Sequence, residues 1–357
     1  PDSPTNFSLP KNQKWLKEEI LKEISHESII PELIPIKFSE ASTKEKRRLF
    51  SCKDPSHNDR VIAQFPIANP EDLANAIRIS SESEIDQWDR DEDFRLSILE
   101  KVAVEIQKNR ASLIISAMRN VAKGVVESDA EVCEAIDFVR YYSSALKSFR
   151  DQYPDIILKK KGVVLVISPW NFPIAIPAGG IAAALATGNR VIVKPSPYSL
   201  LATWKVVELF WKAGVPTSAL QFVPCEDKDA RLLTENPKID HVIFTGSANT
   251  ADKILTARPS LDFSGETSGK NIFIITDTAD KELAIKHLVD STFGYNGQKC
   301  SAASIVILTK EVFSNPKFKS QLKDAVKSIH VGRVEPTNEN KITPLITTPK
   351  SELLKAL

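Results

Sequence analysis

The residue with the clearest potential for chemistry is Cys300, which lies in the string YNGQKCSA (residues 295–302). Small and polar residues flank this thiol, and a lysine precedes it. A thiolate is a strong nucleophile, but it needs help to ionise and a donor that stabilises the oxyanion it creates. A lone cysteine is more often a buried structural thiol, and we assign that role to Cys52, Cys133 and Cys225.

Two other segments hold residues that a nucleophilic thiol would need. In SPWNFP (residues 168–173), which follows a short β-branched run, Asn171 is expected at the ligand-facing end of a sheet, with its amide held between two prolines. The segment from Ser264 to Asn271 places the carboxylate of Glu266 in a flexible loop just before a strand. An amide can donate to an oxyanion, and a carboxylate can act as a general base. Taken singly, both features are also common in purely structural turns.

Two further signals concern phosphate and sugar. FTGS (residues 244–247) follows a strand and opens a helix, so Ser247 and nearby backbone N–H groups could hold a pyrophosphate at a helix N-terminus. An ordinary N-cap serine beside a turn glycine is the alternative. Lys194 ends the apolar run Val191–Val193, where it can point into a ligand crevice and donate to ribose hydroxyls. A solvated strand end explains this lysine equally well.

These residues need a scaffold, and the periodicity of the sequence predicts an α/β one. Apolar residues three and four apart predict helices over residues 12–24 and from 71 to about 146. After Gly162, short β-rich runs alternate with helices, which predicts parallel strands with crossover connections and a doubly wound sheet. A second alternation begins beyond Glu266. The expected strands are 60–65, 163–167, 190–194, 219–224, 241–244, 271–276 and 304–308, and the later helices lie near 180–186, 200–213, 228–235, 251–257, 280–292 and 317–328.

The composition narrows the class of protein. The 47 basic and 46 acidic residues give a formal charge of +1, so no basic excess indicates nucleic-acid binding. The five histidines show no metal-ligand spacing, and we expect no metal. The uncharged stretch from 162 to 189 contains Pro169, Pro173 and Pro177, which argues against a membrane span. Four widely spaced cysteines predict free thiols in a reducing compartment, which is the cytoplasm, or the mitochondrial matrix in a eukaryote.

Together, five motifs resemble those of the aldehyde dehydrogenase superfamily, and they occur in the family's order within residues 55–346. They are SPWNFP (168–173), VIVKP (191–195), FTGS (244–247), GETSGKN (265–271) and GQKCSA (297–302). The resemblance implies a truncated aldehyde dehydrogenase fold, in which a Rossmann-like sheet with a helical N-terminal region precedes the start of a second α/β domain. The corresponding division is a helical extension (1–50), an NAD-binding domain with its N-terminal helices (51–264) and a partial catalytic domain carrying the cysteine (265–357).

The same resemblance implies a role for each candidate residue. Cys300 would attack the aldehyde carbon, the Asn171 amide and the Cys300 backbone N–H would form the oxyanion hole, and Glu266 would activate the hydrolytic water. Lys194 would hold the adenosine ribose, and Ser247 the pyrophosphate. The substrate would contact Asn171, Phe172 and Ser301. The cofactor, NAD with NADP as the alternative, would contact Ser168, Pro169, Trp170, Lys194, Ser196, Gly246, Ser247 and Glu266.

Details around these motifs bear on substrate and cofactor. Thr267 after Glu266, and the string GQKCSA, are most similar to the branch that oxidises glutamate semialdehyde, the open form of pyrroline-5-carboxylate, in proline catabolism. Ser301 is then a candidate donor to the substrate carboxylate, or only a turn hydroxyl. Ser196-Pro197-Tyr198 replaces the acidic residue of many NAD-using members, which keeps NADP open. The alternatives are a dehydrogenase of another aldehyde, such as succinate semialdehyde, and a non-catalytic relative.

Full-length members of the family continue beyond a segment like Thr343–Ile346, with a second glutamate for the nicotinamide ribose and a strand that builds the oligomer. We therefore expect this chain to be part of a longer protein and to be poorly active by itself. The full-length form is expected to be a homo-oligomer that acts on a small aldehyde, without a nucleic-acid or membrane partner.

Overall fold

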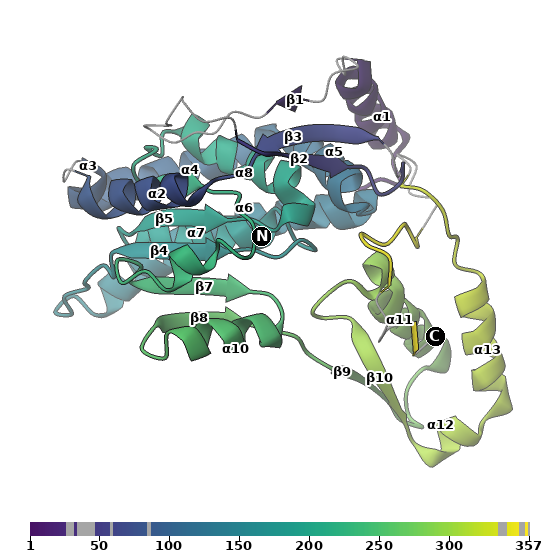
Figure 1. Ribbon diagram of the computed structural model, residues 1–357. Helices are drawn as coiled ribbons and strands as arrows, with labels where there is room; N and C mark the ends of the chain where they lie inside the picture. Colours follow the sequence, from purple (N-terminus) through teal and green to yellow (C-terminus); the bar gives the residue numbers. More distant parts are fainter. Residues whose placement is uncertain are drawn as a thin grey trace.

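The structure, a computed structural model, describes residues 1–25, 32–33, 47–57, 60–83, 87–334, 341–349 and 354–355. A parallel sheet with helices on both faces occupies the centre, and a smaller lobe built around two further strands lies at one end (Figure 1). The predicted extension over residues 1–50 is described only in part, because much of it lies outside these ranges. Within the described ranges, no helix is both long and apolar enough to cross a membrane.

Five parallel strands form the central sheet, in the spatial order β6-β5-β4-β7-β8. From β4 the chain adds β5 and β6 on one side, and then returns to add β7 and β8 on the other. This order confirms the predicted doubly wound sheet. The strands are β4 (Val163–Ile167), β5 (Arg190–Lys194), β6 (Leu220–Phe222), β7 (His241–Thr245) and β8 (Asp262–Glu266).

The edge strand β8 corrects one prediction. The sequence predicts a flexible loop around Glu266, and this is wrong, because residues 264–266 lie in β8 and pair with residues 243–245 of β7. The strand is difficult to recognise because it lies at the exposed edge of the sheet, where its sequence DFSGE needs no apolar alternation. The predicted domain boundary between residues 264 and 265 falls within β8, and the division into domains stays a prediction.

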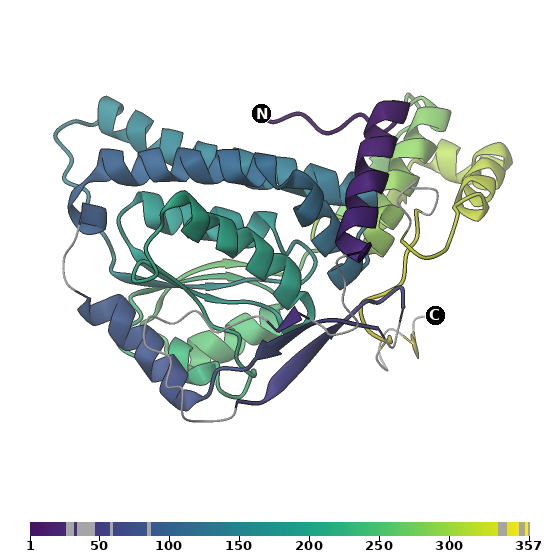
Figure 2. The same cartoon turned by 90° about the horizontal axis from the view of Figure 1, so that it is seen from above.

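Each face of the sheet packs against its own set of helices (Figure 2). Because side chains alternate along a strand, Val164 and Val166 of β4 enter one core, whereas Val163 and Leu165 enter the other. Burial on both faces explains why β4 and β5 are continuous apolar runs. The first core includes α4 (Glu92–Lys108), α5 (Arg110–Val121), α6 (Val125–Gln152), α7 (Ala175–Ala186) and α8 (Leu200–Ala213), and the second includes α2 (Pro70–Glu82), α9 (Arg231–Thr234) and α10 (Ala248–Ala257).

Helix α7 begins earlier than the sequence predicts. The prediction placed it near residues 180–186, but it starts at Ala175. Pro177 lies in its first turn, where a proline removes no hydrogen bond within the helix. Two short elements complete this part of the chain, namely α3 (Gln87–Arg90) and the 3-10 turn η1 (Pro197–Ser199).

The smaller lobe contains β9 (Asn271–Ile275) and β10 (Ala303–Leu308), which pair in parallel. Its helices pack on these strands through a separate apolar cluster that includes Ile275, Leu288 and Phe318. Both strands were predicted. The helical elements are α11 (Lys281–Phe293), the 3-10 turn η2 (Gly294–Gly297), α12 (Lys310–Ser314) and α13 (Pro316–Lys327).

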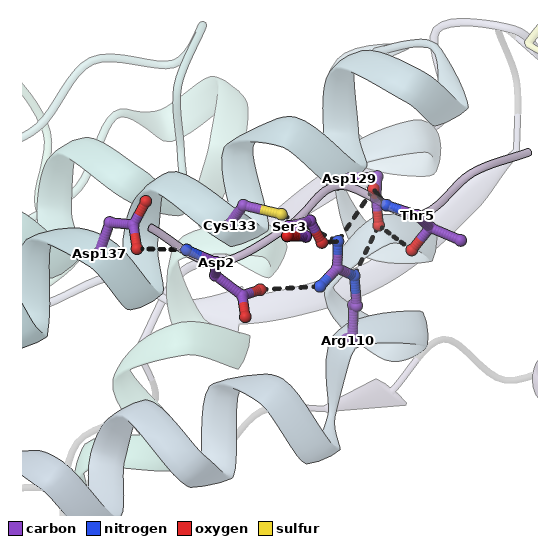
Figure 3. Close-up of polar contacts among 7 residues, drawn as sticks. All are labelled: Asp2, Ser3, Thr5, Arg110, Asp129, Cys133 and Asp137. Carbon is purple, nitrogen blue, oxygen red and sulfur yellow. Dashed lines mark hydrogen bonds and ion pairs between the residues drawn. The ribbon is translucent and has the colours of Figure 1, made fainter.

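The N-terminal region packs against the helices of the first core. Its elements are α1 (Pro10–Ser25), β1 (Glu32–Leu33), β2 (Leu49–Lys53) and β3 (Val61–Pro66), with strand order β1-β3-β2. In the segment before α1, Asp2 accepts a hydrogen bond of 2.9 Å from Arg110, whose Nε donates to Asp129 at 2.6 Å (Figure 3). Asp129 also accepts from the Thr5 backbone N–H at 2.6 Å. An ion pair between α5 and α6 thus holds the start of the chain.

Candidate active site

The carboxyl ends of the central strands bring most of the predicted site residues together. Ser168 follows β4, Lys194 ends β5, Gly246 and Ser247 follow β7, and Glu266 ends β8. All of these strands are parallel, so their carboxyl ends meet at one edge of the sheet. The chain reverses its direction of travel between β4 and β7, and ligands of such sheets bind where the strand order reverses.

An open cleft of about 1710 Å³ runs along this edge and continues to the loop that carries Cys300. A single drug-sized ligand typically occupies about 300–1,000 Å³, so the cleft has room for a larger ligand or for two. Ser168, Pro169, Trp170, Asn171, Lys194, Ser196, Gly246, Ser247, Glu266 and Cys300 line it. The structure does not place Phe172 or Ser301 among the lining residues.

Cys300 differs from the other cysteines in its exposure. It lies on the loop between η2 and β10 and is exposed, whereas Cys52, Cys133 and Cys225 are buried free thiols. Burial raises the pKa of Cys52 and of Cys225 to about 12, which keeps both protonated near neutral pH. The prediction that these three are structural thiols agrees with their burial.

The side-chain amide of Asn171 joins the β4 loop to the loop that carries the cysteine. Its Nδ2 donates to the backbone carbonyl of Gln298 at 2.9 Å, and Gln298 lies two residues before Cys300. An amide nitrogen carries two hydrogens, so the second one can donate to a ligand oxygen. This hydrogen bond fixes the amide, rather than the two flanking prolines on which the sequence prediction relied.

The side chain of Asn271 holds the backbone around Cys300, and this contact was not predicted from the sequence. Its Nδ2 donates to the carbonyl of Cys300 at 2.6 Å and to that of Ala302 at 3.1 Å. It is the first residue of β9, which pairs with β10 immediately after the thiol loop. The spacing of polar residues along the sequence contains no signal for a contact across two parallel strands.

The loop before the thiol adopts an unusual backbone conformation. Tyr295, Asn296 and Gly297 have φ angles of 48°, 59° and 70°, in the left-handed region that glycine favours. The Tyr295 hydroxyl donates to the carbonyl of Val121 at 2.7 Å, and the Asn296 amide donates to the carbonyl of Thr343 at 2.7 Å. These contacts, the first buried and the second partly buried, stabilise a conformation that costs about 1–3 kcal/mol for each non-glycine residue.

The lysine next to the thiol does not face it as a free cation. Lys299 forms an ion pair of 2.8 Å with Glu127 of α6. Its positive charge is therefore largely balanced by that carboxylate.

Lys194 and Ser168 place polar side-chain atoms in the wall of the cleft. The Lys194 side chain is 8% exposed, and its Nζ lies 2.8 Å from a carboxylate oxygen of Asp227, whose own side chain is 86% exposed. The Ser168 hydroxyl is buried and makes no hydrogen bond to any part of the chain that the structure describes. An unsatisfied buried hydroxyl is costly, which indicates a missing partner in the cleft.

Ser247 is the N-cap of α10, as the alternative interpretation of FTGS predicts. Its Oγ accepts a hydrogen bond of 3.2 Å from the backbone N–H of Thr250. The preceding Gly246 lies against the Phe244 ring, where an added Cβ would approach a ring carbon to 2.6 Å. Ser247 and Thr250 both line the cleft, so the capped first turn of α10 lies at the cleft edge.

Two further charged residues contact the Asn171 loop and were not identified from the sequence. Lys123, between α5 and α6, and Glu131 of α6 form a fully buried ion pair of 2.6 Å. The sequence pattern does set Glu131 apart, because this charged residue lies on the buried face of α6 together with Ala135 and Val139. Across the described ranges, no group of three or more His, Cys, Asp or Glu residues could hold a metal ion.

Fold and cleft together define a doubly wound α/β protein with an open cleft at the carboxyl edge of its sheet, where such sheets bind ligands, and with an exposed thiol that lines this cleft. Residues 41–357 match the sequence profile of the Aldehyde dehydrogenase family. Since the match covers most of the chain, the chain belongs to this family. Members of the family are oxidoreductases that act on small aldehydes.

Individual relatives agree with this assignment and with the predicted branch. The chain is 28% identical over 350 residues to 1-pyrroline-5-carboxylate dehydrogenase of Anoxybacillus flavithermus, covering 93% of this chain and 67% of that protein. The structure of 1-pyrroline-5-carboxylate dehydrogenase from Thermus with bound NAD superposes with a TM-score of 0.87 at 27% identity, covering 98% of this chain and 70% of the other. The chain therefore spans about two thirds of the length of these relatives, and the predicted aldehyde dehydrogenase fold is confirmed.

A third relative comes from another branch. The NADP-dependent glyceraldehyde-3-phosphate dehydrogenase from Bacillus halodurans C-125, complexed with NADP, superposes with a TM-score of 0.77 at 27% identity. That alignment covers 87% of this chain and 67% of the other. The similarity to a second branch at the same identity means that the fold alone does not select a substrate.

Proposed function

We propose that this cleft oxidises an aldehyde to a carboxylic acid, with a nicotinamide cofactor and Cys300 as the nucleophile. The observation that carries the proposal is the hydrogen bond from Asn171 to Gln298. It holds an amide with a second available hydrogen beside the loop of the exposed thiol, at the ligand-binding edge of the sheet. A non-catalytic relative would not need this arrangement.

The cleft residues fit a dinucleotide. Ser168 offers a buried hydroxyl that lacks a partner within the described chain, and Lys194 can exchange its highly exposed partner Asp227 for ribose hydroxyls at little cost. Ser247 and the first turn of α10 suit a pyrophosphate. Pro169, Trp170, Ser196 and Gly246 would line the remainder of this site. A bound nicotinamide ring supplies the acceptor for the hydride that leaves the substrate carbon.

The residues of the chain account for the bond-forming steps. The Cys300 thiolate attacks the carbonyl carbon of the aldehyde, so an S–C bond forms and the π electrons of the C=O bond move to oxygen. The Asn171 amide and the Cys300 backbone N–H donate to this oxyanion, and one such donor typically contributes about 3–4 kcal/mol. The oxidised acyl group remains on sulfur as a thioester.

Glu266 completes the reaction as a general base. It is exposed in the cleft at the end of β8, and the Gly246 N–H donates to its backbone carbonyl at 3.1 Å. Its carboxylate accepts a proton from water while the water oxygen attacks the thioester carbon, and the thiolate leaves. A base in this position also disfavours transfer of the acyl group to another thiol acceptor.

For the substrate, we propose glutamate 5-semialdehyde, the open form of pyrroline-5-carboxylate. The relatives named 1-pyrroline-5-carboxylate dehydrogenase and the string GQKCSA support this choice. Ser301 and Phe172 do not line the cleft themselves, but each directly follows a residue that does, Cys300 and Asn171. In this proposal Ser301, which is exposed, donates to the substrate carboxylate, and Phe172 contacts the aliphatic part. Succinate semialdehyde is the alternative. We propose that the cofactor is NAD rather than NADP. We also propose that the full-length protein is a homo-oligomer and that it lies in a reducing compartment.

The test is NAD reduction with glutamate semialdehyde, followed by the absorbance of the reduced cofactor, in the protein at its natural length. Turnover that disappears in Cys300→Ala and falls about a hundredfold or more in Asn171→Ala would support the mechanism and the substrate. Cys300-dependent turnover with succinate semialdehyde alone would retain the mechanism and reject this substrate. Bound NAD without turnover of either aldehyde would reject the catalytic proposal.

A further inference from the structure

The Lys123–Glu131 ion pair is a fully buried pair of charges outside the proposed chemistry. Neither side chain has exposed surface, and Nζ and Oε2 are 2.6 Å apart. Removing two charges from water costs several kcal/mol per ion, and their attraction returns this only with good geometry and further hydrogen bonds. Whether such a pair is stable therefore depends on the other hydrogen bonds and contacts that its atoms make.

Several of its further contacts are with the segment that carries Asn171. Lys123 Nζ donates to the carbonyl oxygen of Asn171 at 3.1 Å and lies 3.5 Å from the centre of the Phe172 ring. Glu131 Oε1 accepts hydrogen bonds from the backbone N–H groups of Ile174 at 2.7 Å and Ala175 at 3.1 Å. The lysine fixes the beginning of this segment, and the glutamate fixes its end at the N-terminus of α7.

The pair also contacts the loop of the nucleophile. Lys123 Nζ lies 5.1 Å from the centre of the buried Tyr295 ring, whose hydroxyl bonds to Val121 in the same turn as the lysine. Asn171 in turn donates to Gln298 on that loop. The ion pair thus sits where the two loops of the proposed oxyanion hole meet, behind the backbone of Asn171.

We propose that Lys123 and Glu131 are positioning residues that hold the Asn171 amide in the geometry needed to stabilise the oxyanion. The proposal rests on the proposed function. A carboxylate supplies two acceptors and an ammonium group supplies three donors, so the pair restrains several atoms of one short segment in fixed directions. Apolar packing at this site would fill the volume without fixing the rotation of the Asn171 peptide.

Two reactions of Cys300 separate this role from general stability. With p-nitrophenyl acetate, the thiolate attacks the carbonyl carbon, an S–C bond forms, p-nitrophenolate leaves, and an oxyanion develops on the way. With iodoacetamide, the thiolate displaces iodide directly from a saturated carbon, and no oxyanion forms at the reacting centre. The ratio of the acylation rate to the alkylation rate therefore reports on the oxyanion hole and requires no cofactor.

The key variant is the double substitution Lys123→Met/Glu131→Gln, which removes both charges at similar volume and avoids a single uncompensated charge. Asn171→Ala shows how far the rate ratio falls when the amide is absent altogether. The matched control is Arg110→Met/Asp129→Asn, which removes a nearly buried pair that also joins α5 and α6 but contacts Asp2 and Thr5 of the N-terminal segment (Figure 3). Glu131→Gln alone, which keeps the shape and one acceptor oxygen, is the second variant if the double variant does not fold.

We expect the acylation-to-alkylation ratio to fall at least about tenfold in Lys123→Met/Glu131→Gln, in the direction of the Asn171→Ala value. The Arg110→Met/Asp129→Asn control should keep the wild-type ratio even if its melting temperature falls. Suppose that Asn171→Ala shows a reduced ratio but the folded double variant has the wild-type ratio. This result overturns the positioning proposal. If only Glu131→Gln folds, a wild-type ratio in that variant overturns it in the same way. If Asn171→Ala has the wild-type ratio, the oxyanion role in the proposed function fails, and the positioning role fails with it.

Discussion

Individual residues at the site owe their properties to their surroundings. Cys300 is exposed in the cleft, whereas burial raises the pKa of Cys52 and Cys225 to about 12 and that of Cys133 to about 11. The Arg110 guanidinium lies 2.8 Å from the Cys133 sulfur, but burial is the larger effect. Residue type alone does not distinguish the four thiols, and burial does.

This difference predicts selective alkylation. In the folded protein at about pH 8, iodoacetamide should modify one thiol per chain, because the three buried thiols are both protonated and inaccessible. After unfolding in urea all four cysteines should react. Mass spectrometry of the intact protein gives the number of adducts, and Cys300→Ala should give none when folded. Rapid modification of two or more thiols in the folded protein would contradict the described burial.

At the scale of elements, the helix ends position the loops of the site. Helix α11 precedes the strained turn before Cys300, and its N-cap is Asp280, whose carboxylate accepts from the backbone N–H groups of Glu282 and Leu283, both at 3.0 Å. The helix buries Ile285, Leu288 and Val289 in the core of the smaller lobe. The cap therefore supports the helix that packs in this core and that leads into the turn before Cys300.

Loss of this cap should destabilise the lobe. We expect Asp280→Ala to lower the free energy of unfolding by about 1 kcal/mol, since two backbone donors lose their acceptor. Asp280→Asn is the matched control, because asparagine caps helices nearly as well as aspartate. Urea unfolding followed by circular dichroism measures both. Equal stabilities of the alanine and asparagine variants would show that the cap contributes nothing.

For the whole molecule, buried thiols link stability to pH. The pKa of Cys225 is about 12 in the folded protein, raised by burial from 9.0. Between these two values the unfolded chain binds fewer protons than the folded chain, so the free energy of unfolding falls as the pH rises. The stabilisation is complete below about pH 9 and is lost progressively toward the folded pKa.

Cys225→Ala tests this linkage. From about pH 8 to about pH 10, the stability difference between wild type and variant should shrink by about 1.4 kcal/mol, because the variant lacks one of the thiols that ionise on unfolding. Urea unfolding at both pH values, with a reducing agent present, gives the difference. Other groups that titrate in this range, Tyr295 included, are common to both proteins and cancel. A difference that is constant with pH would show that Cys225 is not buried as described.

The main sheet and most of the cleft residues could be predicted from the order of the amino acids. Buried parallel strands are short apolar runs, so β4, β5 and β7 could be placed from residues 163–167, 190–194 and 241–244. Residues that follow such strands come to one edge, which is why Asn171, Lys194 and Ser247 were identified as candidates. The strand β8 was missed because an exposed edge strand carries no apolar pattern.

The contacts that hold the groups at this edge could not be predicted in this way, because they join residues far apart along the chain. Asn171 bonds to Gln298 across 127 positions of the sequence, and Lys123 reaches Asn171 across 48. Asn271 supports Cys300 through the pairing of β9 with β10. Local propensity and periodicity act over a few residues, whereas these contacts depend on where separate elements pack. The sequence therefore determined which residues could do chemistry, and packing determined the hydrogen bonds and buried charges that orient them.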